Sequence, residues 1–255
     1  LQSQRSFEQA WRIIPLTRSE QQRHIERSEQ ILAETAPGVT PVLYWSQAEP
    51  AGVVLGFSQK ATILNAQAVT ELRMPVYHRR AGGTAVLVGP HLLALDIVLP
   101  AEHRLVLTDL VESYRWLGET WVRALHLLGI ETRVVSPTEA HTQRALAKQE
   151  TLRARESVLR RACYASNSSY EVVVGARKVV GLDMIRRRHG SLLQAGILLS
   201  WESETLAHLL GHTREEQKLL RQELPKRAIG LDELMQRTVT AQEVMQAFEV
   251  VLDSV

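Results

Sequence analysis

One cysteine and one lysine are the residues best suited to do chemistry. Cys163 is the only cysteine of the 255 residues, and Lys178 follows it 15 positions later at an end of a predicted strand. A thiol becomes a nucleophile where a cation favours its thiolate form. A hairpin between the two positions could return Lys178 or Arg177 to the loop that carries Cys163, and a lysine there could hold an acyl carbonyl as a compact donor. The pattern indicates acyl chemistry. Two simpler interpretations stay open, a buried apolar thiol and a solvated lysine.

A second stretch, Arg79-Arg80-Ala81-Gly82-Gly83-Thr84-Ala85-Val86, runs paired arginines into a Gly-Gly turn and an apolar strand. Backbone without side chains can approach a ligand closely, and guanidinium groups can hold its negative charge. The glycines lack the spacing of a phosphate-binding loop or a dinucleotide fingerprint. The stretch is therefore either a plain turn or a cradle for a ligand of another kind.

Composition excludes several classes of protein. Hydrophobic residues make up 45% and charged residues 23% of the chain, which is typical of a globular protein, and the net charge of +2 predicts no nucleic-acid partner. Leu92–Leu99, among the longest apolar runs, contains Asp96 and is too short to cross a bilayer, so no membrane segment is expected. The scattered histidines and the absence of a Cys-x-x-Cys pair predict no metal site. A lone cysteine and no signal-peptide pattern lead us to expect a cytoplasmic protein.

The elements that must position these residues fit one domain over residues 1–255, of α/β class. Short turns make neighbours of three pairs of predicted strands: the first and second, the fourth and fifth, and the seventh and eighth. The predicted strands are residues 41–45, 52–57, 75–78, 85–88, 92–99, 130–135, 170–174, 178–181 and 191–200. The predicted helical segments are residues 1–36, 65–72, 109–128, 138–161 and 202–255.

Several motifs, in order, resemble those of the lipoate-protein ligase and octanoyltransferase family, whose fold is shared with biotin protein ligase. Residues 79–86 are similar to its Arg-Arg-x-Gly-Gly-x-Ala-Val signature, and Gly175-Ala176-Arg177-Lys178-Val179-Val180-Gly181 to its Gly-x-Lys-hydrophobic-x-Gly segment. Residues 188–199, which contain Gly190 and Gly196, resemble its Arg-x-Gly-x-x-Leu-x-His-Gly-x-x-Leu motif. Trp45 and the run from Gly56 to Gln59 resemble its N-terminal motifs.

The resemblance implies a mixed β-sheet flanked by helices, an α/β (α+β) fold, with an acyl chain in a tunnel lined by the Gly-Gly loop. Lys178 matches the family lysine that binds the acyl carbonyl. Cys163-Tyr164-Ala165-Ser166 matches a cysteine-dependent branch, which moves an octanoyl or lipoyl group through an enzyme thioester to a lysine of a lipoyl-carrier domain. That branch needs no cofactor. The expected catalytic residues are Cys163 and Lys178, and the expected substrate-binding residues are Arg79, Arg80, Gly82, Gly83, Thr84, Ala85, Gly181 and Gly196.

The resemblance also implies partners and leaves alternatives. The carrier domain would belong to the glycine cleavage H protein or to a dehydrogenase acyltransferase subunit, and an acyl carrier protein is a possible donor. A ligase of the same family would instead use ATP, Mg and free lipoate or octanoate through an acyl-adenylate. A third alternative is a lipoyl-domain-binding protein without activity. It is motivated by departures from the family motifs: Val88-Gly89 in place of His-Asp, Leu182-Asp183-Met184 after Gly181, and Ala195 in place of His.

Overall fold

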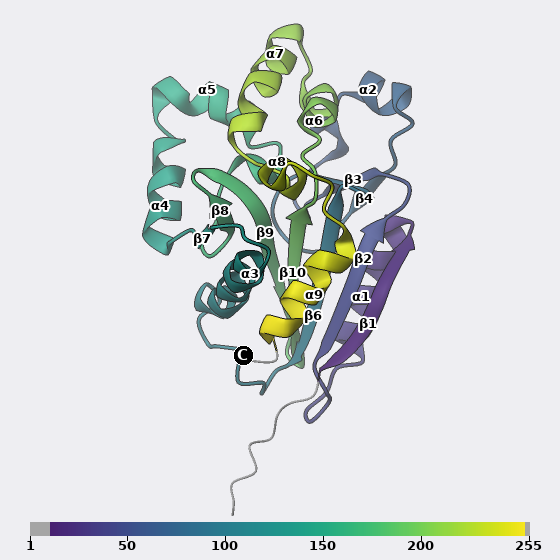
Figure 1. The fold of residues 1–255 in the computed structure, drawn as a ribbon. Coiled ribbons are helices and arrows are strands. Elements are labelled where there is room, and N and C mark those ends of the chain that lie inside the picture. Colours follow the sequence, from purple (N-terminus) through teal and green to yellow (C-terminus); the bar gives the residue numbers. More distant parts are fainter. Residues whose placement is uncertain (1–10, 253–255) are drawn as a thin grey trace, which may run out of the picture.

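The computed structural model describes residues 11–252, and two β-sheets form its centre (Figure 1). The large sheet has the strand order β1-β2-β6-β10-β9-β8-β7; β1 and β2 run parallel and every other pair is antiparallel. Its strands are β1 (Arg12–Ser19), β2 (Val42–Ala48), β6 (Leu92–Pro100), β7 (Arg133–Val134), β8 (Val172–Val174), β9 (Arg177–Arg186) and β10 (Gly190–Leu198). The small sheet has the order β4-β3-β5, from β3 (Gly52–Leu55), β4 (Val76–His78) and β5 (Val86–Val88).

Helices flank both sheets, so the fold is the mixed α/β architecture that the sequence predicts (Figure 1). The α-helices are α1 (Gln21–Ala33), α2 (Ala66–Glu71), α3 (Arg115–Leu127), α4 (Pro137–Leu146), α5 (Glu150–Leu159), α6 (Ser203–Leu210), α7 (Arg214–Glu223), α8 (Leu231–Met235) and α9 (Ala241–Leu252). Short 3₁₀ turns complete the set: η1 (Ala61–Ile63), η2 (Glu112–Tyr114), η3 (Cys163–Ala165) and η4 (Leu224–Lys226). No helix within residues 11–252 is long and apolar enough to cross a membrane.

The two faces of β6 separate the main core from the cavity side of the sheet. Because successive side chains of a strand point to opposite faces, four alternate residues of β6 pack against α3 and α9: Leu93, Leu95, Ile97 and Leu99. On that side Trp45, Trp121 and Phe248 pack together, with ring centroids 4.4 to 6.1 Å apart. The opposite face carries Leu92, Ala94, Asp96 and Val98, and it meets α1 and the small sheet.

The N-terminal prediction is wrong over residues 12–19, which form β1 rather than a helix. β1 is an edge strand, and its ladder shifts register between Ile14 and Thr17, on either side of Pro15. Proline donates no backbone hydrogen bond, so an edge or an irregular position is where a strand accepts it. The helix begins only at Gln21. Residues 1–10 and 253–255 of the two predicted terminal helical segments lie outside the described residues, and residues 203–252 form α6 to α9 with the short turn η4.

Two of the three predicted strand pairs are also wrong. β2 and β3 lie in different sheets, and so do β5 and β6, although short turns join each pair. Both hydrogen-bonding edges of β3 are taken by β4 and β5, which come from further along the chain. The third pair, β8 and β9, is an antiparallel hairpin as predicted. This hairpin is the one that carries Lys178.

Candidate active site

The backbone of Ala85, the residue directly before β5, fixes the position of Cys163. The Cys163 amide donates to the Ala85 carbonyl at 2.9 Å, and the Ala85 amide donates to the Arg161 carbonyl at 3.0 Å. These two bonds join the segment before η3 to the edge of the small sheet. The thiol side chain is only partly buried. Cys163 is therefore held at a defined point of the cavity wall, and the interpretation as a fully buried apolar thiol does not fit.

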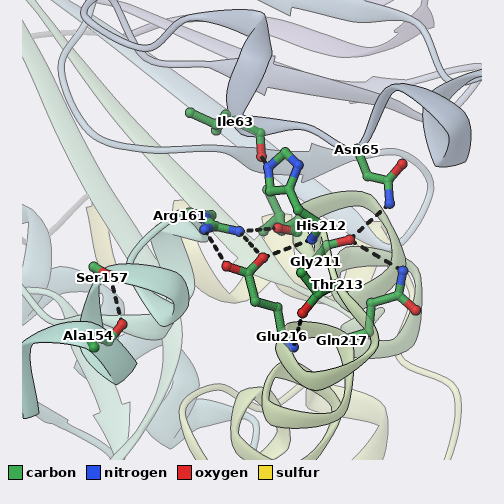
Figure 2. Close-up of polar contacts among 11 residues, drawn as sticks. Ile63, Asn65, Ala154, Ser157, Arg161, Gly211, His212, Thr213, Glu216 and Gln217 are labelled. Atoms are coloured by element: carbon green, nitrogen blue, oxygen red, sulfur yellow. Dashed lines mark hydrogen bonds and ion pairs between the residues drawn. The ribbon is translucent and has the colours of Figure 1, made fainter.

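Arg161, two residues before the cysteine, also holds this segment in place (Figure 2). The Arg161 guanidinium donates to both carboxylate oxygens of Glu216, at 2.7 and 2.8 Å, and to the Leu210 carbonyl at 2.7 Å. The hydrogen bond from Arg161 holds the pKa of Glu216 below its usual value. Glu216 also accepts from the His212 amide at 2.8 Å. The first turn of α7 thus holds the segment that leads into Cys163.

Lys178 reaches back to the cysteine loop, as the hairpin predicts. Its Nζ donates to the Cys163 carbonyl at 3.1 Å and pairs with the Glu171 carboxylate at 2.7 Å, and it lies 5.4 Å from the centre of the Tyr164 ring. Only 1% of the Lys178 side chain is exposed, which contradicts a solvated surface lysine. Two oxygens and the face of an aromatic ring therefore surround the ammonium, and Lys178 is among the residues that line the cavity described below.

Glu171 is part of the site that the sequence analysis did not single out. Its carboxylate accepts from the Ser168 amide at 2.6 Å and the Leu182 amide at 3.3 Å, besides pairing with Lys178. Only 3% of its side chain is exposed. A buried charge needs a partner of opposite charge and hydrogen bonds. An acid inside the apolar run of residues 170–174 was the signal that a cation lies nearby.

A cavity of about 430 Å³ opens between the two sheets beside Cys163 and Lys178. The wall formed by the small sheet is apolar. The wall formed by the large sheet has small residues next to the polar side chains of Asp96, Asp183 and Gln194. The apolar residues are Val54, Val86 and Val88; the small ones are Ala94, Gly181 and Gly196. Such a slot suits a hydrocarbon chain.

Gly196 and Gly181 lie opposite each other on β10 and β9 and leave room for Tyr164. The Tyr164 hydroxyl donates to the Gly196 carbonyl at 2.6 Å, and a Cβ on Gly196 would stand 2.6 Å from that hydroxyl. A Cβ on Gly181 would stand 3.3 Å from the same ring. Burial raises the pKa of Tyr164 well above its usual value, so the hydroxyl keeps its proton as a donor.

The Gly-Gly turn brings a cation next to the thiol. Arg79 donates to the Gly82 carbonyl through Nε at 3.0 Å and Nη2 at 2.8 Å. Gly83 has φ +84°, and a Cβ there would stand 2.5 Å from Arg79 Nη2 and 3.7 Å from Cys163 Sγ. Arg79 and Cys163 therefore flank the same glycine, and this position requires glycine on both conformational and steric grounds.

The remaining predicted site residues divide between the cavity and its surroundings. Thr84 lines the cavity with Arg79 and Gly83. Arg80 does not line it; its Nε pairs with Glu29 at 2.9 Å and its side chain is 65% exposed. Gly82 and Ala85 also lie outside the lining, where their carbonyls hold Arg79 and the Cys163 amide. Gly82 and Ala85 thus support the site from outside the cavity, whereas Arg80 pairs with α1.

Two acids besides Glu171 line the cavity, and burial raises the pKa of both. The pKa of Asp96 is about 6, because burial outweighs the hydrogen bonds from Ser28 and Gln194. The pKa of Asp183 is raised by burial and held back by Arg79, whose Nη2 lies 3.6 Å from Asp183 Oδ2. Asp96, which interrupts the apolar run of residues 92–99, is buried.

Within the part of the chain that the structure describes, no group of three or more His, Cys, Asp and Glu side chains could hold a metal ion. His208 and His212 are four positions apart but contact different groups, the Glu71 carboxylate and the Ile63 carbonyl, each at 3.1 Å (Figure 2 shows the second contact). The side chains that line the cavity include one thiol, four cations, three carboxylates and two tyrosine hydroxyls.

Comparisons with known proteins agree with this fold. The octanoyltransferase LipM of Exiguobacterium sibiricum is 29% identical over 241 residues, 93% of this chain and 84% of that protein. A lipoate protein ligase from the archaeon Thermoplasma acidophilum, solved as part of a bipartite system, superposes with a TM-score of 0.74 at 16% identity, over 96% of this chain and 83% of that one. Biotin protein ligase from Aquifex aeolicus is more distant, with a TM-score of 0.50 at 12% identity, over 95% of this chain and 69% of that one.

The fold is thus that of the lipoate and biotin protein ligases, as the motifs predict. The model of one family, the lipoyl protein ligase A/B catalytic domain, matches residues 22–252, which include both predicted motif regions and every residue of the cavity except Gln21. This match covers most of the chain. The chain belongs to the lipoyl protein ligase A/B catalytic domain family.

Proposed function

We propose that this protein transfers an octanoyl or lipoyl group from a thioester donor to a lysine of a lipoyl-carrier domain, through a thioester on Cys163. The observation that carries the proposal is the contact of the buried Lys178 ammonium with the Cys163 carbonyl at the wall of an acyl-sized cavity. The names of the curated relatives, octanoyltransferases, support the same reaction class.

In the first step the Cys163 thiolate attacks the carbonyl carbon of the donor thioester. A carbon–sulfur bond to Sγ forms, the bond to the donor sulfur breaks, and the donor leaves as a thiol with the proton that Cys163 gave up. The carbonyl oxygen becomes negative on the way. We assign the stabilisation of this charge to the Lys178 ammonium and the Arg79 guanidinium, the two cations nearest to the cysteine loop and the Gly-Gly turn.

In the second step the neutral amine of the carrier lysine attacks the enzyme thioester. A carbon–nitrogen bond forms, the bond to Sγ breaks, and the proton from the nitrogen passes to the thiolate or to solvent. The same two cations stabilise the second oxyanion. The reaction needs neither ATP nor a metal. The donor would be an acyl carrier protein, and the acceptor a glycine cleavage H protein or a dehydrogenase acyltransferase subunit.

The experiment is intact-protein mass spectrometry after mixing the protein with octanoyl-acyl carrier protein. The wild-type protein should gain one octanoyl group, the Cys163→Ala variant none, and addition of a lipoyl domain should move the group to that domain. Normal transfer by Cys163→Ala would exclude the thioester route.

The same assay separates the alternatives. Transfer from free octanoate or lipoate only with ATP and Mg, unaffected by Cys163→Ala, would identify a ligase. Binding of a lipoyl domain without transfer from either donor would identify a binding protein that has kept the fold.

A further inference from the structure

Two arginines line the cavity beside Cys163 and Lys178, the acyl cavity, without a partner in the protein. Arg144 is exposed on α4, and the half-buried Arg160 directly follows α5. Neither side chain forms a hydrogen bond or an ion pair with any of residues 11–252. Arg160 stands three positions before Cys163, so their Cα atoms are at most about 11 Å apart. Both guanidinium groups are therefore open to a ligand that reacts at Cys163.

A second cavity, of about 380 Å³, adjoins the acyl cavity. Four residues line both cavities: Arg144, Arg160, Ser166 and Ser168. The cavities therefore meet along the loop that follows Cys163. The Asn167 amide in this loop donates to Gln143 Oε1 at 3.3 Å, which joins the loop to α4, the helix of Arg144. A long ligand with its reacting end at Cys163 can extend past the two arginines into the second cavity.

The lining of the second cavity is positively charged. It contains four cations and one acid: Arg144, Arg160, Lys226, Arg227 and Glu156. The acid is already compensated, because Glu156 accepts from Arg227 at 2.6 Å and lies 3.5 Å from the Arg155 guanidinium. Lys226 pairs with Glu223 at 2.9 Å. Among the described residues that line this cavity, Arg144 and Arg160 are thus the cations without a counter-charge.

The other cations of the acyl cavity have acids beside them. Lys178 pairs with Glu171 at 2.7 Å, and Arg79 lies 3.6 Å from Asp183. An anion for the two free arginines must therefore come with the ligand. The planar donor fork of a guanidinium matches the oxygens of a phosphate. An octanoyl chain has no charge, so the anion would belong to the part of the donor that carries the acyl group.

We propose that Arg144 and Arg160 bind the phosphodiester of the phosphopantetheine arm of an acyl carrier protein, and that the second cavity holds this arm. The proposal rests on the proposed function and places its donor. The arm has the acyl thioester at one end, which meets Cys163, and the phosphodiester at the other. Between them the arm carries amide groups, and polar side chains of the second cavity can bond to these: Gln143, Ser166, Asn167 and Ser168.

The test compares two small donors that differ only in the phosphate, octanoyl-pantetheine and octanoyl-phosphopantetheine. Acylation of Cys163 is followed by rapid quenching and intact mass. For the wild-type protein, kcat/KM should be about tenfold or more higher for the phosphorylated donor, because hydrogen bonds to a charged group are the strong ones. Arg144→Gln and Arg160→Gln should each reduce this ratio by about threefold or more, and the double variant should bring it close to one.

Two further variants separate the phosphate contact from general charge. Arg160→Lys should keep part of the ratio, because lysine retains the charge and loses the fork. Arg153→Gln is the matched control: Arg153 is exposed on α5 and lines neither cavity, and its removal takes away the same charge. This control should keep the wild-type ratio. With octanoyl-acyl carrier protein, which carries the same arm, the double variant should lower kcat/KM by about tenfold or more.

Several outcomes would overturn this inference and leave the proposed function standing. They are a wild-type ratio near one, a ratio that the double variant does not change, and an equal loss in Arg153→Gln. Equal slowing by the double variant of transfer from acylated Cys163 to a lipoyl domain would also overturn it, because that step no longer involves the arm. Slowing only of a reaction that needs ATP would assign the arginines to a nucleotide instead. No acylation of Cys163 by the small donors or by octanoyl-acyl carrier protein would remove the proposed function and this inference together.

Discussion

Lys178 Nζ lies 3.1 Å from the carbonyl oxygen of Cys163, and the same ammonium pairs with the Glu171 carboxylate. Glu171 neutralises the ammonium at 2.7 Å, in a place where 1% of one side chain and 3% of the other are exposed. A buried ammonium without a counter-charge is unfavourable. The position of the candidate nucleophile therefore depends on the pairing of Lys178 with Glu171.

Removing one partner of this buried pair should lower the stability of the folded protein. Glu171→Leu leaves a buried ammonium and Lys178→Met leaves a buried carboxylate, so each should lower the free energy of unfolding by about 3–5 kcal/mol. The double variant should recover most of that loss, because no uncompensated charge remains. Urea unfolding measures all three. Arg177→Met is the control: its partner Glu233 is 60% exposed, and the loss should stay below about 1 kcal/mol. Additive losses in the double variant would contradict the account.

The contact between Arg161 and Glu216 should act on catalysis through the placement of Cys163. Glu216→Gln removes one charged acceptor and should lower the unfolding free energy by about 1–3 kcal/mol. It should also slow acylation of Cys163 at saturating donor more than it changes KM, since Glu216 does not line the cavity. Arg221 lies on the same helix as Glu216, and Arg221→Ala breaks its more exposed pair with Glu204 of α6. This variant should change neither the unfolding free energy nor the acylation rate noticeably. A change in KM alone would argue that Glu216 does not act by positioning Cys163.

The local elements were predictable where a segment's own residues decide its structure. α3 buries Leu117, Trp121 and Leu125 at four-residue spacing, and Gly129 at φ +79° follows its end, as the pattern predicts. Pairing of strands was not predictable in the same way. β3 and β5 have buried residues throughout, so their sequences contain no alternation that tells which neighbour each one joins.

The residues of the site divide in the same way, into those that short motifs locate and those that depend on contacts between distant segments. Motif order located Cys163, Lys178 and the Gly-Gly turn, because these depend on short segments. It gave no sign that Arg80 pairs with the distant Glu29 on α1 and lies outside the cavity lining. It also missed Glu171 as a partner and the register that aligns Asp183 with Gln194, because both depend on contacts between segments.

The two glycines of the turn should respond differently to alanine. Gly83→Ala forces a left-handed conformation on alanine and crowds Arg79 Nη2. It should therefore lower the free energy of unfolding by about 1–3 kcal/mol and slow acylation of Cys163 by about tenfold or more. A Cβ on Gly82 meets nothing within 4 Å, and that residue has no positive φ. Gly82→Ala should therefore stay within about 0.5 kcal/mol of the wild-type protein. Urea unfolding measures the loss of stability, and the rate at which Cys163 gains the acyl group, followed by intact mass, measures the effect on acylation. Equal losses in the two variants would show that the turn is not built as described.

The buried Asp96 predicts that stability changes with pH. Its folded pKa of about 6 is above the ordinary 3.8, so the folded protein holds the proton more tightly, and stability is lost as pH rises from 4 through 6. At one pKa unit per 1.36 kcal/mol, the loss from this group between about pH 4.5 and pH 7.5 is about 2 kcal/mol. Asp96→Asn keeps an oxygen for Gln194 and cannot ionise. The unfolding free energy of the variant minus that of the wild-type protein should therefore rise by about that amount between the two pH values. The subtraction cancels the other titrating groups, and a difference independent of pH would mean that Asp96 is not buried as a carboxyl of raised pKa.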